Sequence, residues 1–207
     1  MNSKRNIYKY KLKCFTNQVF VYSANNKINA QDLILHRGMS NYDFPIIYIQ
    51  SNQEGYNHPI WTDFLNANCF NQCVVSDRVI NLLLDNNING WQTFPIEIYD
   101  DKENYIGGYN GLSVVGRCHS LDFTQTIKME DDSFYGSRHL GFPLDLTTWD
   151  GCDIFAYEDT CSTFMTQKVK NLFKKHKISN IKFEDITEVI IIDKWNKFIN
   201  DDPTTQL

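Results

Sequence analysis

The stretch that decides the fold is CVVSDRVINLLLDNNINGWQTFPIEI, residues 73–98, because its pattern recurs 90 positions later. The second copy is TFMTQKVKNLFKKHKISNIKFEDITEVI, residues 163–190. Each copy holds a short apolar run, a hydroxyl residue, an amphipathic helix pattern, a stop and a strand pattern. One such unit cannot bury the apolar face of its helix alone, so we predict that the two pack on one core. The aligned pairs include Val74 with Phe164, Ser76 with Thr166, Val79 with Val169, Leu83 with Phe173 and Ile88 with Ile178.

The spacing of apolar residues predicts one helix over 77–87 and a second that begins at Thr163 or Thr166 and ends near 177. Ser76 is a suitable N-cap, since its hydroxyl can accept from an amide of the first turn. Strands are predicted over 91–99 and 181–192. Pro95 has no amide hydrogen to donate, so it places the first of these strands at an edge or a bulge.

Residues 1–70 are predicted to add strands and loops to the same domain. Lysines alternate with apolar residues over 8–14, which predicts a strand whose hairpin partner is 18–22. Further predictions are a strand over 45–50, a short helix over 61–66, a charged turn over 100–104, a turn at Asn110-Gly111 and a closing helix over 193–200 with Trp195, Phe198 and Ile199 on one face. No low-complexity linker interrupts the chain. We therefore expect one α+β domain over 1–207, with a mixed, mostly antiparallel sheet.

Composition narrows the classes of partner. The 207 residues are 42% hydrophobic and 14% aromatic, enough for a large core. The net charge of −5 argues against nucleic acid, which favours a basic stripe. No run approaches the ~20 apolar residues of a membrane span, and the N-terminus has no apolar signal core. We therefore expect a cytoplasmic protein with reduced cysteines.

Three segments carry a resemblance to a known family. They are CVVSDRVINLLLDNNINGWQTFPIEIYD, YNGLSVVGRCHSLDFTQT and DIFAYEDTCSTFMTQKVKNLFKKHKISNIKF. Together they resemble immunity family eleven of the bacterial polymorphic-toxin systems, formerly a domain of unknown function. The matching positions, within residues 73–189, are Val75-Ser76, Val79, Gly90, Pro95, Leu121-Asp122, Ile154-Phe155 and Ile178. The chain departs from the family pattern at Met165-Thr166-Gln167 and has Asn180 where the family has Gly.

The resemblance implies a non-enzymatic cytoplasmic protein that binds and neutralises a toxin encoded next to it. It does not identify the toxin, and the family pattern contains no reactive group. We also predict no cofactor.

Two groupings could carry chemistry instead. Cys69 and Cys73, with Cys118-His119, Cys152 and Cys161 elsewhere, could supply thiolate or imidazole ligands for zinc. No C-x-x-C spacing occurs, however, and we predict no metal site. Cys118-His119 with Asp122 suggests a thiol nucleophile with a base and a group that orients it, although neighbours on a strand point to opposite faces. A base would then have to come from elsewhere, for example His139 or His36.

For a partner surface, acidic loops and turn aromatics are the favoured residues. Acidic loops suit the basic clefts of nucleases, and exposed Tyr and Trp often anchor interfaces. The leading hypothesis is a toxin-binding immunity protein. A cysteine/histidine-dependent hydrolase or transferase and an oligomerising scaffold remain as alternatives, and the oligomeric state is open. The candidate partner-binding residues are Trp149, Tyr105, Tyr109, Asp131, Asp132 and Tyr135.

Overall fold

The computed structural model describes residues 7–12, 20–23, 45–51, 60–67, 73–129, 136–157 and 162–192. These residues form α-helices α2 (Asp77–Asp85) and α3 (Gln167–Lys175), 3-10 turns η3 (Phe123–Gln125) and η4 (Leu146–Thr148), and short strands. The strands are β1 (Ile7–Leu12), β2 (Phe20–Ser23), β3 (Ile46–Gln50), β4 (Phe64–Ala67), β5 (Cys73–Ser76), β6 (Trp91–Phe94), β7 (Ile96–Tyr99), β8 (Tyr109–Val114), β9 (Gly116–Cys118), β10 (Ile127–Lys128), β11 (Arg138–Leu140), β12 (Ile154–Tyr157), β13 (Thr163–Thr166), β14 (Ile181–Asp185) and β15 (Ile190–Ile192).

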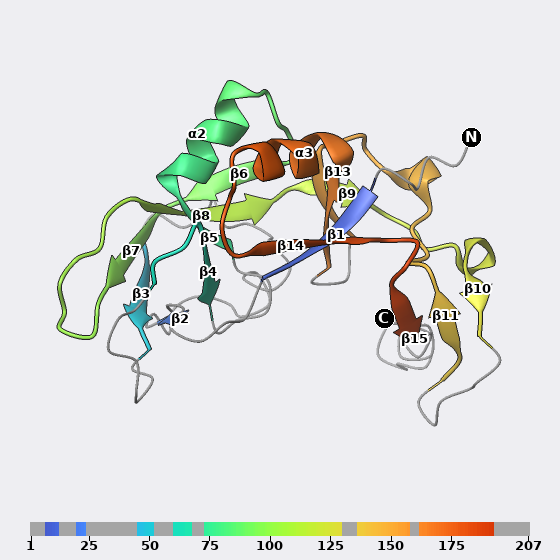
Figure 1. Ribbon diagram of the computed structural model, residues 1–207, viewed down its shortest axis with the longest axis horizontal. Helices are drawn as coiled ribbons and strands as arrows, with labels where there is room; N and C mark the ends of the chain where they lie inside the picture. Colours follow the sequence, from blue (N-terminus) through green and yellow to red (C-terminus); the bar gives the residue numbers. More distant parts are fainter. Residues whose placement is uncertain are drawn as a thin grey trace, which may run out of the picture.

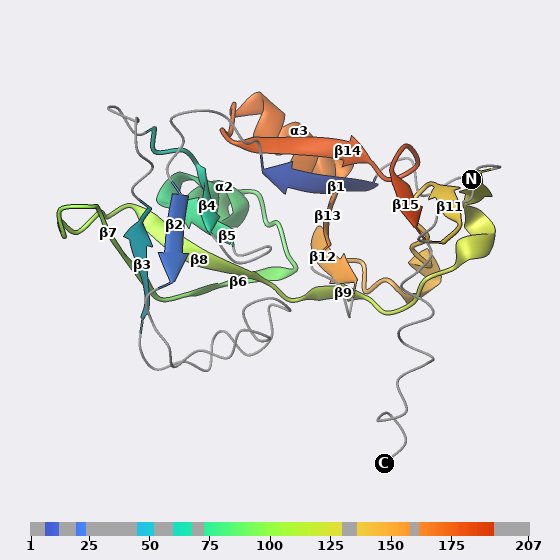
Figure 2. The same ribbon diagram turned by 90° about the horizontal axis from the view of Figure 1, so that it is seen from below.

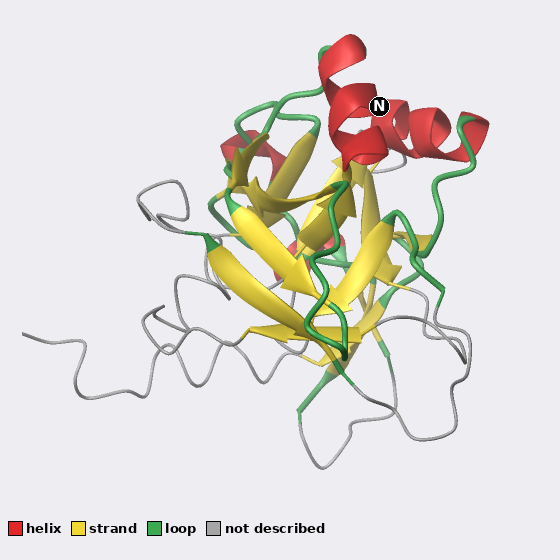
Figure 3. Ribbon diagram, turned by 90° about the vertical axis from the view of Figure 1, so that its left-hand side faces the viewer, coloured by secondary structure: helices red, strands yellow, loops and turns green. Residues whose placement is uncertain are grey.

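The strands are divided among three sheets rather than joined in one (Figure 1). The orders are β6-β8-β5-β4-β2-β3-β7, β14-β1-β13-β12-β9 and β10-β11-β15. Most neighbours are antiparallel, and the parallel pairs are β2–β4, β3–β7 and β9–β12. Both helices lie together on one side of the strands (Figure 3). The predicted α+β class with a mostly antiparallel arrangement is confirmed.

Both repeats share one hydrophobic core. Val79 of α2 and Val169 of α3 are fully buried in the same cluster of side chains. Leu83 and Phe173, the next pair of equivalent residues, are buried there too. Burial of four such side chains at ~2 kcal/mol each exceeds what either helix contributes through its own hydrogen bonds. The prediction that two similar helix–strand units pack together is therefore confirmed.

The duplication is longer than the sequence pattern indicated, and its first strands are exchanged. β1 lies between β13 and β14 of the second repeat, while β8 lies between β5 and β6 of the first. The registers match: Ile7 faces Thr166 as Tyr109 faces Ser76. Figure 2 shows β1 beside β14, although they come from opposite ends of the chain. In chain order, β1-β2-β4-β5-α2-β6 thus corresponds to β8-β9-β12-β13-α3-β14, and each half completes the other's sheet.

Two equivalent aspartates join the halves. Asp63, before β4, accepts hydrogen bonds from the Ser76 hydroxyl at 2.8 Å and from the Arg78 guanidinium at 3.1 Å, and its Oδ2 accepts from the amide and hydroxyl of Ser179, each at 2.8 Å. Arg78 also donates to the carbonyl oxygen of His176, at the end of α3. The first repeat is therefore bonded to the turn that follows the helix of the second.

Asp153, before β12, makes the reciprocal contacts. It accepts from the Thr166 hydroxyl at 3.1 Å and from Lys168 Nζ at 2.9 Å, and its own amide donates to Asn89 Oδ1 at 2.7 Å. Lys168 also donates to the Asn87 carbonyl oxygen at 3.2 Å, after α2. We call these two groups the Asp63 clamp (Asp63, Ser76, Arg78, Ser179) and the Asp153 clamp (Asp153, Thr166, Lys168, Asn89). Neither Ser76 nor Thr166 caps its helix with its side chain, because each hydroxyl donates to a clamp aspartate instead.

The turn after each helix must also pass close to the opposite repeat. Gly90 has φ +88°, and an added Cβ would lie 1.9 Å from the Ile154 carbonyl oxygen. Its equivalent Asn180 has φ +61° and donates from its side-chain amide to the Phe64 carbonyl oxygen at 2.6 Å. Asparagine tolerates this left-handed conformation better than most residues. The departure from glycine at Asn180 therefore gains a buried hydrogen bond between the repeats.

The strand predicted over 91–99 is divided at Pro95. β6 pairs with β8 at one edge of the seven-stranded sheet, and β7 pairs with β3 at the other. Since β6 and β7 are consecutive, the sheet curls until its two edges meet at Pro95, whose carbonyl oxygen accepts from the Ile46 amide at 3.0 Å. Phe94 and Ile98 fill the interior of the curl, together with Val21, Ile46, Tyr48, Leu65 and Val74.

Other sequence predictions are wrong for identifiable reasons. β2 pairs with β3 and β4, not with β1, because β1 is taken by the second repeat. A strand, β4, replaces the helix expected over 61–66. Asn110-Gly111 lies inside β8, where Gly111 leaves room for the Phe94 ring 2.2 Å from where its Cβ would be. The strand expected over 181–192 is broken by a turn at Thr187, whose amide and hydroxyl donate to Asp185 Oδ1. The helix expected over 193–200 lies outside the described residues.

Candidate functional site

The strands and helices that occur in both repeats form the common core. A functional site is therefore expected among the elements that have no equivalent in the other repeat. β3, β7 and the turn that follows β7 occur at one end of the molecule, and η3, β10, β11 and β15 at the other (Figure 1). The common core does not require either group, because the shared strands and helices already complete it. We take the turn after β7, residues 97–106, as the candidate site and call it the acidic turn.

Asp100 holds the acidic turn in one shape. Its Oδ1 accepts from the amides of Lys102 and Asn104, both at 2.8 Å, and its Oδ2 accepts from the Asn104 side chain at 2.9 Å. These bonds from Asn104 are the leading cause of the lowered pKa of the Asp100 carboxyl. The Asp100 amide donates to the Asn104 carbonyl oxygen at 2.9 Å, and Glu103 takes φ +65° to close the turn. The acidic turn is therefore organised by hydrogen bonds within its own residues.

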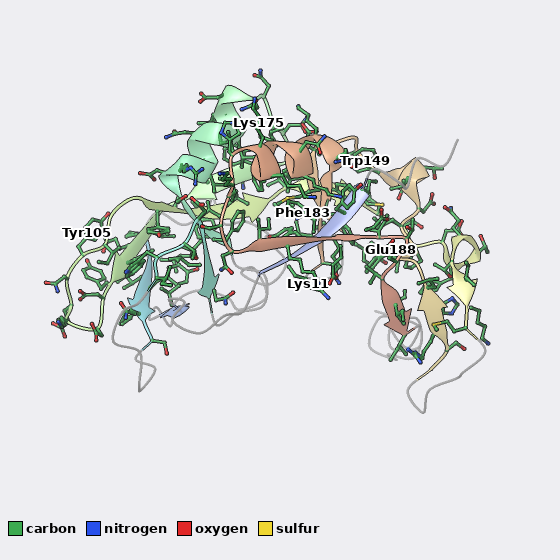
Figure 4. The ribbon with its side chains drawn as sticks, viewed as in Figure 1. Lys11, Tyr105, Trp149, Lys175, Phe183 and Glu188 are labelled. Carbon is green, nitrogen blue, oxygen red and sulfur yellow. The ribbon has the colours of Figure 1, made fainter. Side chains whose placement is uncertain are left out.

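Two tyrosines flank the turn across its base. Tyr99 and Tyr105 form an isolated bridge, with their rings edge to face at 6.0 Å. The Tyr99 hydroxyl donates to Glu97 at 2.9 Å, which is the first cause of its raised pKa. Tyr105 is 62% exposed and extends from the end of the molecule (Figure 4). The sequence prediction for Tyr105 thus falls on an exposed aromatic ring beside a charged turn.

The charge of this surface is negative. Residues 97–106 contain four acids, Glu97, Asp100, Asp101 and Glu103, against Lys102. Asp101 and Glu103 are exposed at the tip of the turn. An exposed aromatic ring with carboxylates around it is suited to binding a basic cleft. The carboxylates would speed association with the cleft, and the ring would pack into it.

The other candidate residues lie apart from this surface. Tyr109 is half-buried at the start of β8, where its ring packs on Trp61 at 5.8 Å and its hydroxyl donates to the Thr62 carbonyl oxygen at 3.1 Å. Burial, reinforced by Asp63, raises the pKa of Tyr109 to about 12. Trp149 lies in the second repeat, half-buried with its ring 5.2 Å from Phe155 (Figure 4). Asp131, Asp132 and Tyr135 lie outside the described residues.

The candidate thiol nucleophile lies in a packed environment. Cys118 is fully buried, and its Sγ contacts the Asp145 carbonyl oxygen at 3.3 Å and the Thr148 hydroxyl at 3.7 Å. Burial raises the pKa of its thiol, which favours the unreactive protonated form. His139 is in a different sheet, where its Nδ1 is 2.8 Å from the Thr126 hydroxyl. The thiol and the imidazole are thus held in separate sheets, each with contacts of its own. His36 lies outside the described residues.

Among the described residues, no three His, Cys, Asp or Glu side chains gather closely enough to hold a metal ion. Within the same residues, neither helix has the length and apolar character needed to cross a membrane.

Sequence reasoning missed Asp63, whose carboxylate accepts hydrogen bonds from Ser76, Arg78 and Ser179. A signal was present, because Asp63 and Asp153 are separated by the same 90 positions as Val79 and Val169. Comparisons with models of known protein families and with curated proteins gave no match.

Proposed function

We propose that this protein is a non-enzymatic immunity protein that binds a bacterial toxin in the cytoplasm and blocks it. The proposal draws on the resemblance of residues 73–189 to a toxin-immunity family and on the form of the acidic turn. The partner is a toxin encoded in the neighbouring gene.

One observation carries the proposal. The exposed Tyr105 ring lies in the same turn as the exposed carboxylates of Asp101 and Glu103, and hydrogen bonds to Asp100 hold that turn in one shape. A loop already held in its bound shape loses little conformational entropy on binding, so more of its contact energy appears as affinity. The neighbouring strands β3 and β7 add the surrounding contact area. A standard interface buries roughly 1,600 Å² in total, which exceeds what the turn alone offers.

The mechanism is steric and electrostatic. Asp101 and Glu103 attract a basic cleft, and the Tyr105 ring then packs into it and excludes the toxin's substrate. This division of labour predicts that charge at the tip sets the rate of association, while the ring sets the rate of dissociation. No group of this protein changes covalently in the process.

The first test is co-expression with the adjacent toxin gene. Cells that make both proteins are expected to survive, and the purified pair is expected to form a stoichiometric complex. If the toxin still kills cells in which this protein is abundant and folded, the proposal fails.

The second test locates the surface. Tyr105→Ala is expected to raise the Kd for the toxin by about 30-fold, since truncation of an anchoring aromatic costs ~2 kcal/mol. Asp101→Lys is expected to slow association about tenfold at low salt and much less at high salt. The matched control is Leu84→Ala on the outer face of α2, where a side chain 60% exposed is removed. Equal affinity for Tyr105→Ala and Leu84→Ala would show that the toxin binds elsewhere.

A further inference from the structure

The five-stranded sheet of the second repeat ends at β14. Among the described strands, β14 pairs with β1 and with no other (Figure 2). In the first repeat the equivalent strand, β6, continues through Pro95 into β7, and β3 and β7 let the sheet curl until its edges meet. The described part of the second repeat adds no such strands to its sheet, so β14 is an edge strand. The backbone amide and carbonyl groups of an edge strand can pair with a further strand.

Opposite charges alternate with apolar residues along β14. Phe183 points toward α3, with its ring 6.4 Å from that of Phe173 (Figure 4). Lys182 and Glu184 lie on the other side of the sheet, where Lys182 is directly opposite Lys11 of β1. Glu184 forms ion pairs with both lysines, at 2.8 Å to Lys11 and 3.4 Å to Lys182. One carboxylate is thus shared by two facing lysines, and Lys182, whose side chain is 62% exposed, can donate to a second carboxylate.

We propose that β14 pairs with β14 of a second copy of this chain, antiparallel about a two-fold axis beside Phe183. This register places residue 182 of each copy opposite residue 184 of the other. Each Lys182 then lies directly across from the Glu184 carboxylate of the second copy, within the reach of a cross-strand pair. The two five-stranded sheets join into one continuous sheet. A two-fold pair of this kind needs one self-complementary surface and forms a closed dimer.

The charges of β14 select this register over the others. A pair centred on residue 182 would bring two Lys182 ammonium groups face to face, and a pair centred on residue 184 would do the same with two Glu184 carboxylates. Like charges directly opposite each other destabilise a strand pair. A pair centred on residue 181 or 185 would use only one end of β14. The register centred on Phe183 alone pairs the whole strand and sets opposite charges against each other.

The inference goes beyond the proposed toxin binding and does not depend on it. The acidic turn follows β7, which belongs to the seven-stranded sheet, whereas β14 belongs to the five-stranded sheet. The experiments below need no toxin, so their failure would leave the proposed function untouched, and failure of the toxin experiments would leave the dimer untouched.

The first experiment is sedimentation of the full chain. A pair of short strands buries less than a standard interface, so we expect a monomer–dimer equilibrium between about 1 µM and about 500 µM. Lys182→Glu and Glu184→Lys are each expected to weaken self-association about 30-fold, because two attractive cross-strand pairs become repulsive. The matched control is Lys175→Glu, the same change of charge at an exposed position of α3, which is expected to dimerise like the wild type.

The second experiment mixes the two charge variants. Lys182→Glu carries two carboxylates along its edge, and Glu184→Lys carries two ammonium groups. In the mixed pair each carboxylate meets an ammonium group, so a one-to-one heterodimer is expected at concentrations where neither variant self-associates. Because the heterodimer needs an intact β14 in both chains, its formation also shows that the variants are folded.

Three results would overturn the inference. The first is a wild type that stays monomeric at every concentration. The second is a dimer whose Kd is the same in the wild type, Lys182→Glu and Glu184→Lys, since the interface would then lie elsewhere. The third is a mixture of the two variants that forms no heterodimer although circular dichroism shows both to be folded.

Discussion

Replacement of Asp63 by Ala is expected to destabilise the protein far more than the equivalent change at Asp153. The Asp63 side chain is 10% exposed, and its carboxylate accepts from Ser76, Arg78 and twice from Ser179. Asp153 is 16% exposed and accepts from Thr166 and Lys168 alone. The two positions share a place in the duplicated fold, so each serves as the control for the other.

The magnitudes follow from these contacts. The three bonds from Ser76 and Ser179 to Asp63 contribute about 1 kcal/mol each, because their loss leaves polar groups without an acceptor. The Arg78 contribution is small, since that side chain is 54% exposed and its ion pair is screened. Asp63→Ala is therefore expected to cost about 3 kcal/mol and Asp153→Ala about 1 kcal/mol.

Equilibrium unfolding in urea at pH 7 measures both. The midpoint is expected to fall for Asp63→Ala with an unchanged slope, because the surface exposed on unfolding is the same. Asp101→Ala, an exposed carboxylate of the acidic turn, should change the free energy of unfolding by less than about 0.5 kcal/mol. The reasoning is refuted if Asp63→Ala and Asp153→Ala cost the same, or if Asp63→Ala costs less than about 1 kcal/mol.

Three further outcomes follow from the same contacts. Burial alone would raise the pKa of Asp63, but the hydrogen bonds from Ser179 and Ser76 and the charge of Arg78 lower it below the ordinary value. The wild type is therefore expected to be more stable than Asp63→Asn above about pH 4, and this advantage is expected to shrink as the pH falls further. Urea titrations between about pH 6 and 3 measure the difference. Gly90→Ala is expected to cost at least about 3 kcal/mol, since its Cβ would meet the Ile154 carbonyl oxygen at a positive φ, and a normal melting temperature for the variant would contradict this. Burial raises the pKa of the Cys152 thiol to about 11, so alkylation at pH 8, followed by peptide mass spectrometry, should be about a hundredfold slower than in the urea-unfolded chain; equal rates would show that the thiol is accessible and ionised.

Local features of this protein were predictable because they depend on residues close in sequence. The two helices are defined by apolar residues at helical spacing, and their apolar faces identified Val79 and Val169 as neighbours in one core. Tyr105 and the charged turn could be located because turn-forming residues act over four or five positions. The predictions of a helix over 61–66 and of a turn at Asn110-Gly111 were wrong for a non-local reason. In both places a local preference gave way to a partner elsewhere in the chain: β2, which pairs with β4, for the first, and Phe94 for the second.

Sequence was therefore sufficient for the α+β class, the pair of repeated units and the residues that each unit buries, since periodicity alone records which face of an element is apolar. Only the tertiary structure revealed that β1 and β8 are exchanged, that Asp63 and Asp153 join opposite halves, and that the curled sheet closes at Pro95. Strand pairing uses backbone groups common to all residues, so a strand's own sequence does not specify its neighbour. The choice is made by the whole core, where β1 fits the second repeat as β8 fits the first.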